Sequence, residues 1–334
     1  MIDWRNPRVA RRRRRKPLLW DAKLLNCVYG GLNSSGTTVQ EQAHFDAIFR
    51  AGFNGCRIGP RWEHIEPTLG AGIDTSLITQ VVRRCANAGL TVLIELHHTG
   101  TSSFPVGAST AVMIDTVTND SVEAVKALTR IALNEPNVIA IGTANEVAET
   151  TLSSQIVSCN LTLERVIRQA GWRGIVLGMV NNGQNTNGGS WASFMDAHPL
   201  NMLETHWYFG GGHADGFGSV QAGGGRFSSQ GANLSNGTTA LSATASFPQF
   251  EAHMERWLAM PGIDQKRVFM GEWGIGLDES GAGQFVDYMR QVMDSRGIGN
   301  AWWRDIDAGA KMAIFRNADS SATLPHALTR RIVQ

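Results

Sequence analysis

One kind of joint occurs at four places along this chain of 334 residues. At each place a helical pattern ends in a glycine suited to the left-handed end of a helix, and a β-rich run follows. The joints read AGFNGCRI, AGLTVLIEL, AGWRGIVLG and RGIGNAWW, and their glycines are Gly52, Gly89, Gly171 and Gly297. These glycines are separated by 37, 82 and 126 residues, which is close to one, two and three times a spacing of about 40. The spacing indicates that one strand-helix unit repeats.

The patterns on either side of the joints favour a parallel sheet covered by helices. Before Gly89, apolar residues fall on one helical face, at Leu77, Ile78, Val81, Val82 and Cys85. The strand runs are continuously apolar rather than alternating, as expected for a sheet buried on both faces. With about 40 residues per unit the chain holds eight units, the size of a barrel. We therefore predict an α/β fold, a single-domain (β/α)8 TIM barrel. A doubly wound open sheet is the alternative, but no glycine-rich fingerprint follows the first strand, LLNCVYGG.

The composition is globular, with 43% hydrophobic and 18% charged residues. No apolar run approaches the ~18 residues that a membrane-spanning helix needs, and no secretory signal is visible. The net charge of +1 hides an asymmetry, because the first 16 residues carry eight basic side chains and one acidic side chain. We expect residues 1–20 to form a basic, disordered tail and residues 21–334 to form the folded domain. The run RRRRRK leaves binding to nucleic acid or anionic lipid as an alternative.

Two further features bear on cofactors. The four cysteines, Cys27, Cys56, Cys85 and Cys159, form no close pair such as CxxC, so we expect small buried side chains rather than a metal or redox site. Residues 210–246 are polar and glycine-rich, and they lack the strand-to-helix order of a phosphate-binding loop. We interpret this stretch as a loop along a cleft. His213 and Asp215 within it are too sparse to predict a calcium site. No cofactor or metal is predicted.

In a barrel, reactive side chains belong at the carboxyl ends of the strands. Those ends are rich in polar and aromatic residues: Arg57 and Trp62 after the second strand; Glu95, His97 and His98 after the third; Asn145 and Glu146 after the fourth; His206, Trp207 and Tyr208 after the sixth; Glu272 and Trp273 after the seventh; Trp302 and Trp303 after the eighth.

The fourth of these ends, NVIAIGTANEVAE over residues 137–149, has two interpretations. Asn145 could cap the following helix, with Glu146 at its positive end. Alternatively, Glu146 is one of two reactive carboxylates, and Glu272 is the other. Hydrolysis of a glycosidic bond needs one proton donor and one nucleophile, about 5 Å apart for a retaining enzyme. Tryptophans near several strand ends would suit a carbohydrate, because a flat indole covers the apolar face of a sugar ring.

These residues resemble glycoside hydrolase family 5, in the clan of barrel glycosidases that carry their carboxylates on strands four and seven. The resemblance runs from about residue 25 to residue 320. It rests on the order Arg57, His97, Asn145-Glu146, His206-x-Tyr208, Glu272 and a tryptophan on strand eight. Three features depart from the family pattern: NEV where NEP is common, the charges of WWRDID, and the length of the loop at 210–246. The long loop leaves the substrate open.

The resemblance implies a role for each matching residue. Glu146 would be the general acid and then the general base, and Glu272 the nucleophile that forms a glycosyl-enzyme intermediate. Arg57 and Tyr208 would hold Glu272 ionised. Asn145 would bind the sugar 2-hydroxyl, His97 would bind the neighbouring sugar, and His206 would lie beside the acid/base. The candidate substrate-binding residues are Trp303, which aligns best as the sugar platform, and Trp302, His98, Trp62, Trp191 and Trp207.

The resemblance also implies an activity. The favoured one is a retaining endo-β-1,4-glucanase, or cellulase, acting on polysaccharide or oligosaccharide chains. β-Mannan, xyloglucan and β-1,3-glucan remain open as substrates, and a carbohydrate-binding barrel without catalysis is the alternative from another class. We expect a secreted monomer by resemblance, without a membrane span or a nucleic-acid partner.

Some of these residues have structural interpretations as well. Arg57 could form an ion pair inside the barrel with Glu95, whose role is then structural. His97 and His98 point to opposite faces if their strand is regular, which disfavours a shared metal ion. Trp62 and Trp191 could be sugar platforms or packing residues.

Overall fold

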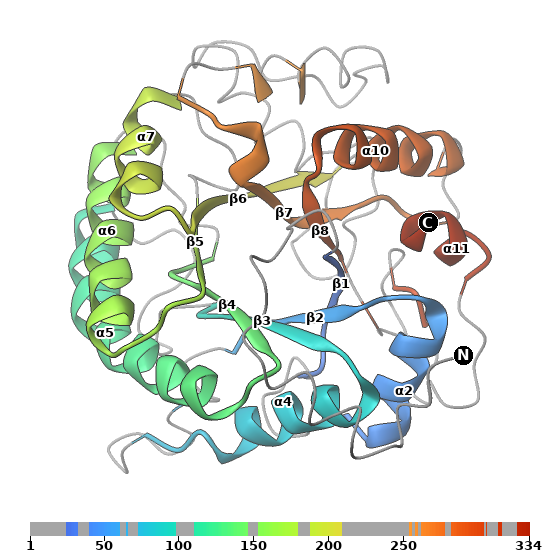
Figure 1. The fold of residues 1–334 in the computed structure, drawn as a ribbon, viewed down its shortest axis with the longest axis horizontal. Helices are drawn as coiled ribbons and strands as arrows, with labels where there is room; N and C mark the ends of the chain where they lie inside the picture. Colours follow the sequence, from blue (N-terminus) through green and yellow to red (C-terminus); the bar gives the residue numbers. More distant parts are fainter. Residues whose placement is uncertain are drawn as a thin grey trace.

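The chain forms a closed barrel of eight parallel strands in the order β1 to β8, surrounded by helices (Figure 1). This is the predicted (β/α)8 barrel, in a single domain. The computed structural model describes residues 25–32, 40–60, 65, 73–97, 110–145, 153–179, 188–208, 254–255, 258–259, 262–277, 282–303, 305, 313–315 and 326–334. The basic segment 1–20 and the glycine-rich loop 210–246 lie outside these residues.

Strands and helices alternate along the described chain. The strands are β1 (Asn26–Tyr29), β2 (Gly55–Ile58), β3 (Thr91–Glu95), β4 (Val138–Gly142), β5 (Ile175–Met179), β6 (Asn201–Tyr208), β7 (Val268–Gly274) and β8 (Gly299–Trp302). The helices are α2 (Gln42–Ala51), α4 (Ser76–Ala88), α5 (Thr110–Asn134), α6 (Ser153–Gln169), α7 (Gly188–Ala197), α10 (Ala282–Arg296) and α11 (Thr329–Val333), with a short 3-10 helix, η3 (Gln265–Arg267), before β7.

The four joint glycines all have the positive φ that the sequence pattern predicts: Gly52, Gly89, Gly171 and Gly297. Gly89 shows how such a joint works. Its φ is 86°, in the left-handed region that residues with a Cβ rarely adopt, and its amide donates to the carbonyl of Ala86. The chain thereby leaves α4 and enters β3 two residues later. The repeat in the sequence therefore reflects a local requirement for glycine at these four helix-to-strand joints.

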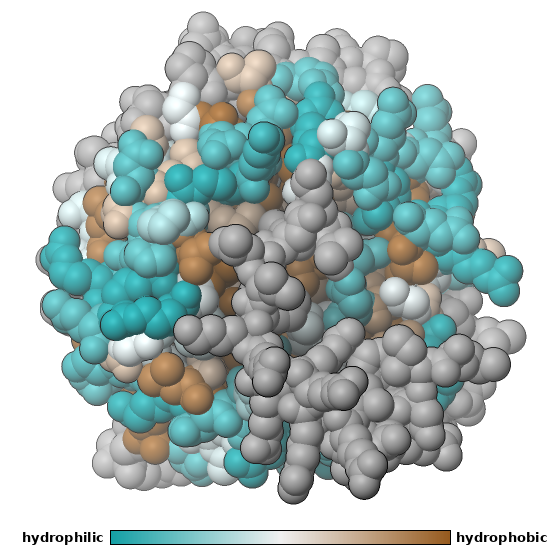
Figure 2. Space-filling view, viewed as in Figure 1, coloured by the Kyte–Doolittle hydropathy of each residue, from teal (hydrophilic) through white to brown (hydrophobic). Residues whose placement is uncertain are grey.

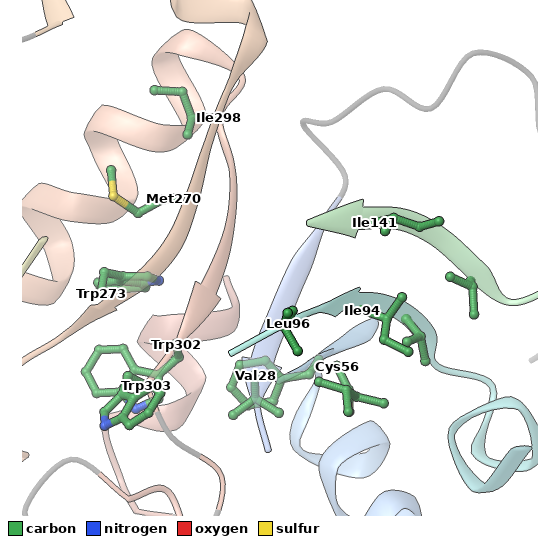
Figure 3. Packing of buried hydrophobic residues seen from close by; sticks show 14 of the residues in the cluster. Val28, Cys56, Ile94, Leu96, Ile141, Met270, Trp273, Ile298, Trp302 and Trp303 are labelled. Carbon is green, nitrogen blue, oxygen red and sulfur yellow. The ribbon is translucent and has the colours of Figure 1, made fainter. Parts of the chain in front are cut away.

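The main hydrophobic core lies between the barrel wall and the helices. On α4 the buried residues are Ile78, Val81, Val82 and Cys85, while Leu77 is half-buried. Figure 3 shows this outer layer beside several strands, including Cys56 on β2 and Ile94 on β3. The described helices present mostly hydrophilic side chains to solvent in the view of Figure 2. No described helix is long and apolar enough to cross a membrane.

A second, smaller hydrophobic cluster fills the barrel interior. It contains Leu25, Cys27, Leu93, Ile139, Ala140, Ile175, Leu177, Met202, Phe269 and Ala301. Side chains two positions apart on a strand point to the same face of the sheet. Two members of the cluster are followed, two positions later, by a charged residue on that same interior face. Leu93 is followed by Glu95 on β3, and Met202 is followed by Glu204 on β6. The interior therefore changes from apolar to charged toward the carboxyl ends of the strands.

The cysteines behave as the sequence predicts. Cys27, Cys56, Cys85 and Cys159 are all buried, and none of them forms a disulfide bond. Burial raises the pKa of the Cys27 thiol well above its ordinary value, which keeps it protonated. These residues pack in the barrel wall and on α4 and α6.

The C-terminal helix completes the ring. α11 lies between α10 and α2 (Figure 1). The amide group of Asn26 at the start of β1 donates to the carbonyl of Ile332, at 3.2 Å. On its outer side, Arg331 forms an ion pair with Asp287 of α10. These contacts hold the C-terminal helix α11 against the first strand, β1, and against α10.

Candidate active site

Arg57 occupies the centre of the charged layer. It comes from β2 and is completely buried, and each of its three guanidinium nitrogens faces a different carboxylate. Nη1 donates to Glu272 at 2.7 Å and Nη2 donates to Glu95 at 2.7 Å. Nε lies 2.6 Å from Oε1 of Glu204, too poorly aligned for a hydrogen bond. Nη2 also donates to Oδ1 of Asn145, at 2.8 Å. The ends of β2, β3, β4, β6 and β7 thus meet at one side chain.

A bulge in β7 turns Glu272 toward this centre. Thr205 of β6 pairs with Met270, and the next residue, His206, pairs with Glu272, so Gly271 is an extra residue. Phe269 lies in the inner cluster, so strict alternation would point residue 272 outward. With the bulge, Glu272 contacts Arg57 inside the barrel, and Trp273 packs in the outer core.

His206 and His97 extend the polar cluster on two sides. Nδ1 of His206 lies 3.4 Å from Oε2 of Glu272, and its Nε2 lies 3.7 Å from Oε1 of Glu204. Nδ1 of His97 is 2.8 Å from Oε1 of Glu95. Both rings are buried. His206 therefore lies against the predicted nucleophile, and His97 is oriented by a carboxylate that Arg57 also binds.

Burial and Arg57 together determine the ionisation of this cluster. Burial raises the pKa of Glu95 well above its ordinary value, although the guanidinium of Arg57 opposes that shift. Burial acts in the same direction on Glu204, but the attraction of Arg57 and His206 outweighs it and the pKa of Glu204 is lowered. Burial alone would lower the pKa of Arg57, yet the carboxylates of Glu204, Glu95 and Glu272 raise it. Arg57 is therefore a permanent cation.

An aromatic group covers the cluster. Tyr29, at the end of β1, stacks on Trp303 with ring centroids 4.2 Å apart and the planes inclined by 28°. His97 is nearly parallel to Trp303, at 6.0 Å and 13°. The Cζ atom of Arg57 lies 5.4 Å from the centre of the Tyr29 ring. Trp303 is thus held beside the residues that surround Glu272.

The remaining described tryptophans lie in the core. Trp302 packs edge-to-face on Trp273, with ring centroids 4.8 Å apart. Figure 3 labels both residues in the buried cluster. Trp302, Trp207 and Trp191 all have no solvent exposure and belong to the outer hydrophobic cluster. Their indoles therefore fill the space between barrel and helices, and no face is open to a sugar. This differs from the expectation that they bind substrate. The pleat explains the difference for Trp302, because neighbouring residues point to opposite sides.

Several predicted site residues lie outside the described part of the chain. These are Glu146, His98, Trp62 and the side chain of Tyr208. Their predicted roles stay predictions. Asn145, which directly precedes Glu146, is described and buried, and its contact with Arg57 places the end of β4 at the centre.

Three residues of the cluster were not predicted as site residues. Glu204 precedes His206 by two in MLETHWYF, and that alternation was the available signal. Tyr29 ends the first strand, a position where a polar aromatic residue is itself a signal in a barrel. Glu95 was also not among the predicted site residues; an ion pair with Arg57 was the structural alternative for that arginine, and the two residues form this pair.

This arrangement can keep the carboxylate of Glu272 ionised and hold it in a fixed orientation. Glu272 accepts a charge-assisted hydrogen bond from Arg57, which stabilises its charged form in a buried site. Among the described residues no group of three His, Cys, Asp or Glu side chains is arranged to hold a metal ion. The chemistry available from these residues is that of an oriented carboxylate, with an imidazole and an amide beside it.

Solved structures with similar folds include endoglucanases. An endo-β-1,4-glucanase from Xanthomonas axonopodis pv. citri superposes with a TM-score of 0.66 at 19% identity, covering 93% of this chain and 98% of that one. A hyperthermophilic endo-β-1,4-glucanase in complex with substrate gives 0.65 at 17% identity, with 94% and 97% covered. Thermotoga maritima Cel5A in complex with mannotriose gives 0.63 at 14% identity, with 88% and 94% covered. At these identities the likeness shows the fold.

Comparison of the sequence identifies the family, which the similarity of the folds does not. No curated protein sequence matches the chain. The family model for cellulase, glycosyl hydrolase family 5, matches residues 27–309, which includes all eight strands except the first residue of β1. The match therefore spans the barrel and every described residue of the charged cluster. By this match the chain belongs to glycosyl hydrolase family 5 and is a glycoside hydrolase.

Proposed function

We propose that this protein is a retaining endo-β-1,4-glucanase, which cleaves internal bonds of a β-glucan by double displacement. Glu272 is the nucleophile and Glu146 the general acid/base. The observation that carries the proposal is the meeting of two strand ends at Arg57. Its Nη1 binds Glu272 of β7, and its Nη2 binds Asn145, the residue before Glu146. The two strands on which a barrel glycosidase needs its carboxylates are thus fastened to one guanidinium.

Particular side chains act in each of the two chemical steps. In the first step, Glu272 attacks the anomeric carbon of the sugar, and the leaving oxygen takes the proton of Glu146. Arg57 keeps Glu272 ionised before the attack, because its cation favours the charged carboxylate. In the second step, Glu146 removes a proton from water, which attacks the anomeric carbon and releases Glu272. The configuration at that carbon is retained because it is inverted twice.

The neighbouring residues bind and orient the sugar. Asn145 is oriented by its hydrogen bond to Arg57 and would donate its amide hydrogens to the 2-hydroxyl. Trp303 would lie under the reacting ring, since it is stacked on Tyr29 near the cluster. His97, fixed by Glu95, would bind the adjacent sugar.

The substrate is the less constrained part of the proposal. Two of the similar structures are endo-β-1,4-glucanases, which favours a β-1,4-glucan. The complex of Thermotoga maritima Cel5A with mannotriose favours β-mannan as a second candidate. Xyloglucan and β-1,3-glucan are further candidates within the family. The proposal includes secretion, because a polysaccharide is degraded outside the cell.

The test is release of reducing sugar from a panel of polysaccharides: carboxymethylcellulose, barley β-glucan, glucomannan, galactomannan, xyloglucan and laminarin. We expect β-1,4-glucans to be cut, with a rapid fall in viscosity that reports internal cleavage. Glu146→Ala and Glu272→Gln should each lose several orders of magnitude in kcat, of the order of 10³-fold or more. Proton NMR of the first product anomer should show retention.

The possible results separate the alternatives. Cleavage of galactomannan alone would move the assignment to a β-mannanase, and an inverted first anomer would exclude the double displacement. Binding without any cleavage would support the carbohydrate-binding barrel instead. Near-wild-type hydrolysis by Glu272→Gln would exclude Glu272 as the nucleophile.

A further inference from the structure

Glu204 lies in the middle of the charged layer, and the proposed reaction assigns it no role. It comes from β6, two residues before His206, and its side chain is completely buried. Its Oε1 lies 2.6 Å from Nε of Arg57 and 3.7 Å from Nε2 of His206. These are the two residues that also contact Glu272, through Nη1 of Arg57 and Nδ1 of His206. Glu204 thus touches both neighbours of the proposed nucleophile.

Burying such a carboxylate costs free energy unless a cation compensates it. Here the compensation comes from Arg57, which is shared among three carboxylates. Among the described residues neither oxygen of Glu204 has a well-aligned hydrogen-bond donor. An apolar side chain at this position would fold at lower cost. The burial of this carboxylate is not explained by a gain in stability, which suggests that it has a role in function.

The backbone around Glu204 makes room for it. A Cβ on Gly271, the extra residue of the β7 bulge, would lie 1.8 Å from Oε1 of Glu204. The same glycine that shifts Glu272 to the inside of the barrel therefore leaves the space that Glu204 fills.

We propose that Glu204 is a positioning residue of the active site, which holds the guanidinium of Arg57 and the ring of His206 in the orientation where both meet Glu272. The inference rests on the proposed function, in which Glu272 is the nucleophile. Glu204 acts through these two residues and does not touch the sugar. The carboxylate of Glu204 lies against Nε of Arg57. Rotation of the guanidinium away from Glu272 would therefore break the ion pairs of Arg57 with Glu204 and with Glu272 at the same time.

The charge of Glu204 has a second effect. The titratable and charged groups around it are Arg57 on β2, Glu95 and His97 on β3, His206 on β6, Glu272 on β7 and Tyr29 on β1. Glu146 and the side chain of Tyr208 lie outside the described residues. A neighbouring negative charge disfavours ionisation of Glu272. Without it, Glu272 would lose its proton at a lower pH, and Arg57 would be shared by two carboxylates rather than three.

The first experiment measures kcat and KM against pH for Glu204→Gln, with an aryl β-cellobioside as substrate. We expect kcat to fall by about tenfold or more, as for loss of orientation, with KM within about twofold. The acid limb of the kcat/KM profile should move to lower pH. Glu204→Asp, which keeps the charge, should restore the acid limb to its wild-type position. Glu164→Gln is the matched control, because Glu164 is also buried and paired, with Arg168 at 2.9 Å, but lies on α6.

The second experiment tests whether activity is lost because the Glu204 carboxylate is displaced rather than because the protein misfolds. Gly271→Ala should reduce kcat, because the new methyl group would displace the carboxylate of Glu204. In a Glu204→Ala background the methyl group has space, so the same substitution should cause a much smaller further loss. Equal losses in both backgrounds would overturn the proposal, as would an unchanged kcat and pH profile in Glu204→Gln.

A third measurement does not depend on hydrolysis. The Nε–H resonance of Arg57 in a ¹⁵N-labelled protein, identified by its loss in Arg57→Lys, should shift in Glu204→Gln and not in Glu164→Gln. If the wild-type protein cuts no glycoside while this resonance shifts, the proposed function fails and the contact stands. If the wild-type protein is active and neither the resonance nor the pH profile changes, only the role of Glu204 fails.

Discussion

Nη1 of Arg57 lies 2.7 Å from Oε1 of Glu272, and both side chains are almost completely excluded from solvent. A buried ion pair of this kind is weakly stabilising as a whole, but removing one partner leaves a charge without compensation. Arg57 forms ion pairs with three carboxylates, Glu95, Glu204 and Glu272. The site and the stability of the barrel therefore depend on the same guanidinium.

Arg57→Lys should lower both stability and activity. A single ammonium group cannot reproduce the separate contacts of the three guanidinium nitrogens. We expect a loss of roughly 3–5 kcal/mol in the free energy of unfolding, measured by urea denaturation. The control is Arg50→Lys, since Arg50 is exposed in the last turn of α2. Equal stability of the two variants would contradict the central role of Arg57.

Glu95→Gln should change how stability depends on pH. The folded state raises the pKa of Glu95 by burial, so above its ordinary pKa, 4.5, the folded state binds a proton that the unfolded state has lost. Stability from this group is therefore present at low pH and declines as pH rises toward the folded pKa, by at most about 1.4 kcal/mol per pH unit.

Urea unfolding of wild type and Glu95→Gln between about pH 5 and 8 checks this sign. The free energy of unfolding of wild type relative to the variant should fall as pH rises. For Glu204→Gln the direction is opposite and the pH range is lower. The pKa of Glu204 is lowered from its ordinary 4.5, so its contribution is present above about pH 4.5 and is lost as pH falls through the folded pKa. A pH-independent difference for Glu95→Gln would show that Glu95 is ionised in the folded state.

Gly59→Ala should impair substrate turnover with little loss of fold. A Cβ at this position would lie 2.7 Å from Nδ1 of His97 and 2.7 Å from the hydroxyl of Tyr29. Both rings support Trp303, so displacing them should reduce kcat/KM by about 10–100-fold. Gly283→Ala is the control, because its methyl group would meet the guanidinium of the exposed Arg331 side chain, which lies outside the charged cluster. Unchanged turnover in Gly59→Ala would exclude these rings from the site.

The two tryptophans at the end of β8 should give opposite phenotypes. Trp302→Ala removes a completely buried indole and should cost about 3–5 kcal/mol in the free energy of unfolding. Trp303→Ala should instead reduce kcat/KM by roughly tenfold or more, as expected for loss of an aromatic contact with the sugar. Thermal unfolding and aryl-glycoside kinetics on both variants distinguish the roles. A loss of turnover confined to Trp302→Ala would reverse the assignment of the platform.

The four cysteines should be unreactive in the native protein. Cys27, Cys56, Cys85 and Cys159 are all buried, and a buried thiol is inaccessible to a reagent in solution. Titration with a chromogenic disulfide reagent should detect no rapid reaction before denaturant is added, and four thiols afterwards. Rapid reaction of a native thiol would show that the wall near β1, β2 or α6 opens.

The sequence by itself determined the repeat and therefore the barrel. Four of the helix-to-strand joints have a glycine in the left-handed region, and the sequence carries this local requirement directly, as at Gly52 and Gly89. The strand ends were also readable, because a barrel collects reactive residues at one end, so Arg57, Asn145 and Glu272 could be named in advance.

Only the tertiary structure decided which way these side chains point. Glu272 faces inward because Gly271 is an extra residue in the pairing of β6 with β7, and a bulge depends on the neighbouring strand rather than on local propensity. The same kind of dependence packs Trp302 edge-to-face on Trp273 and stacks Trp303 on Tyr29. Glu204 became part of the site only when barrel closure brought β6 against the guanidinium of Arg57. Burial and pairing across strands are properties of the closed barrel, so they are absent from any single segment of the chain.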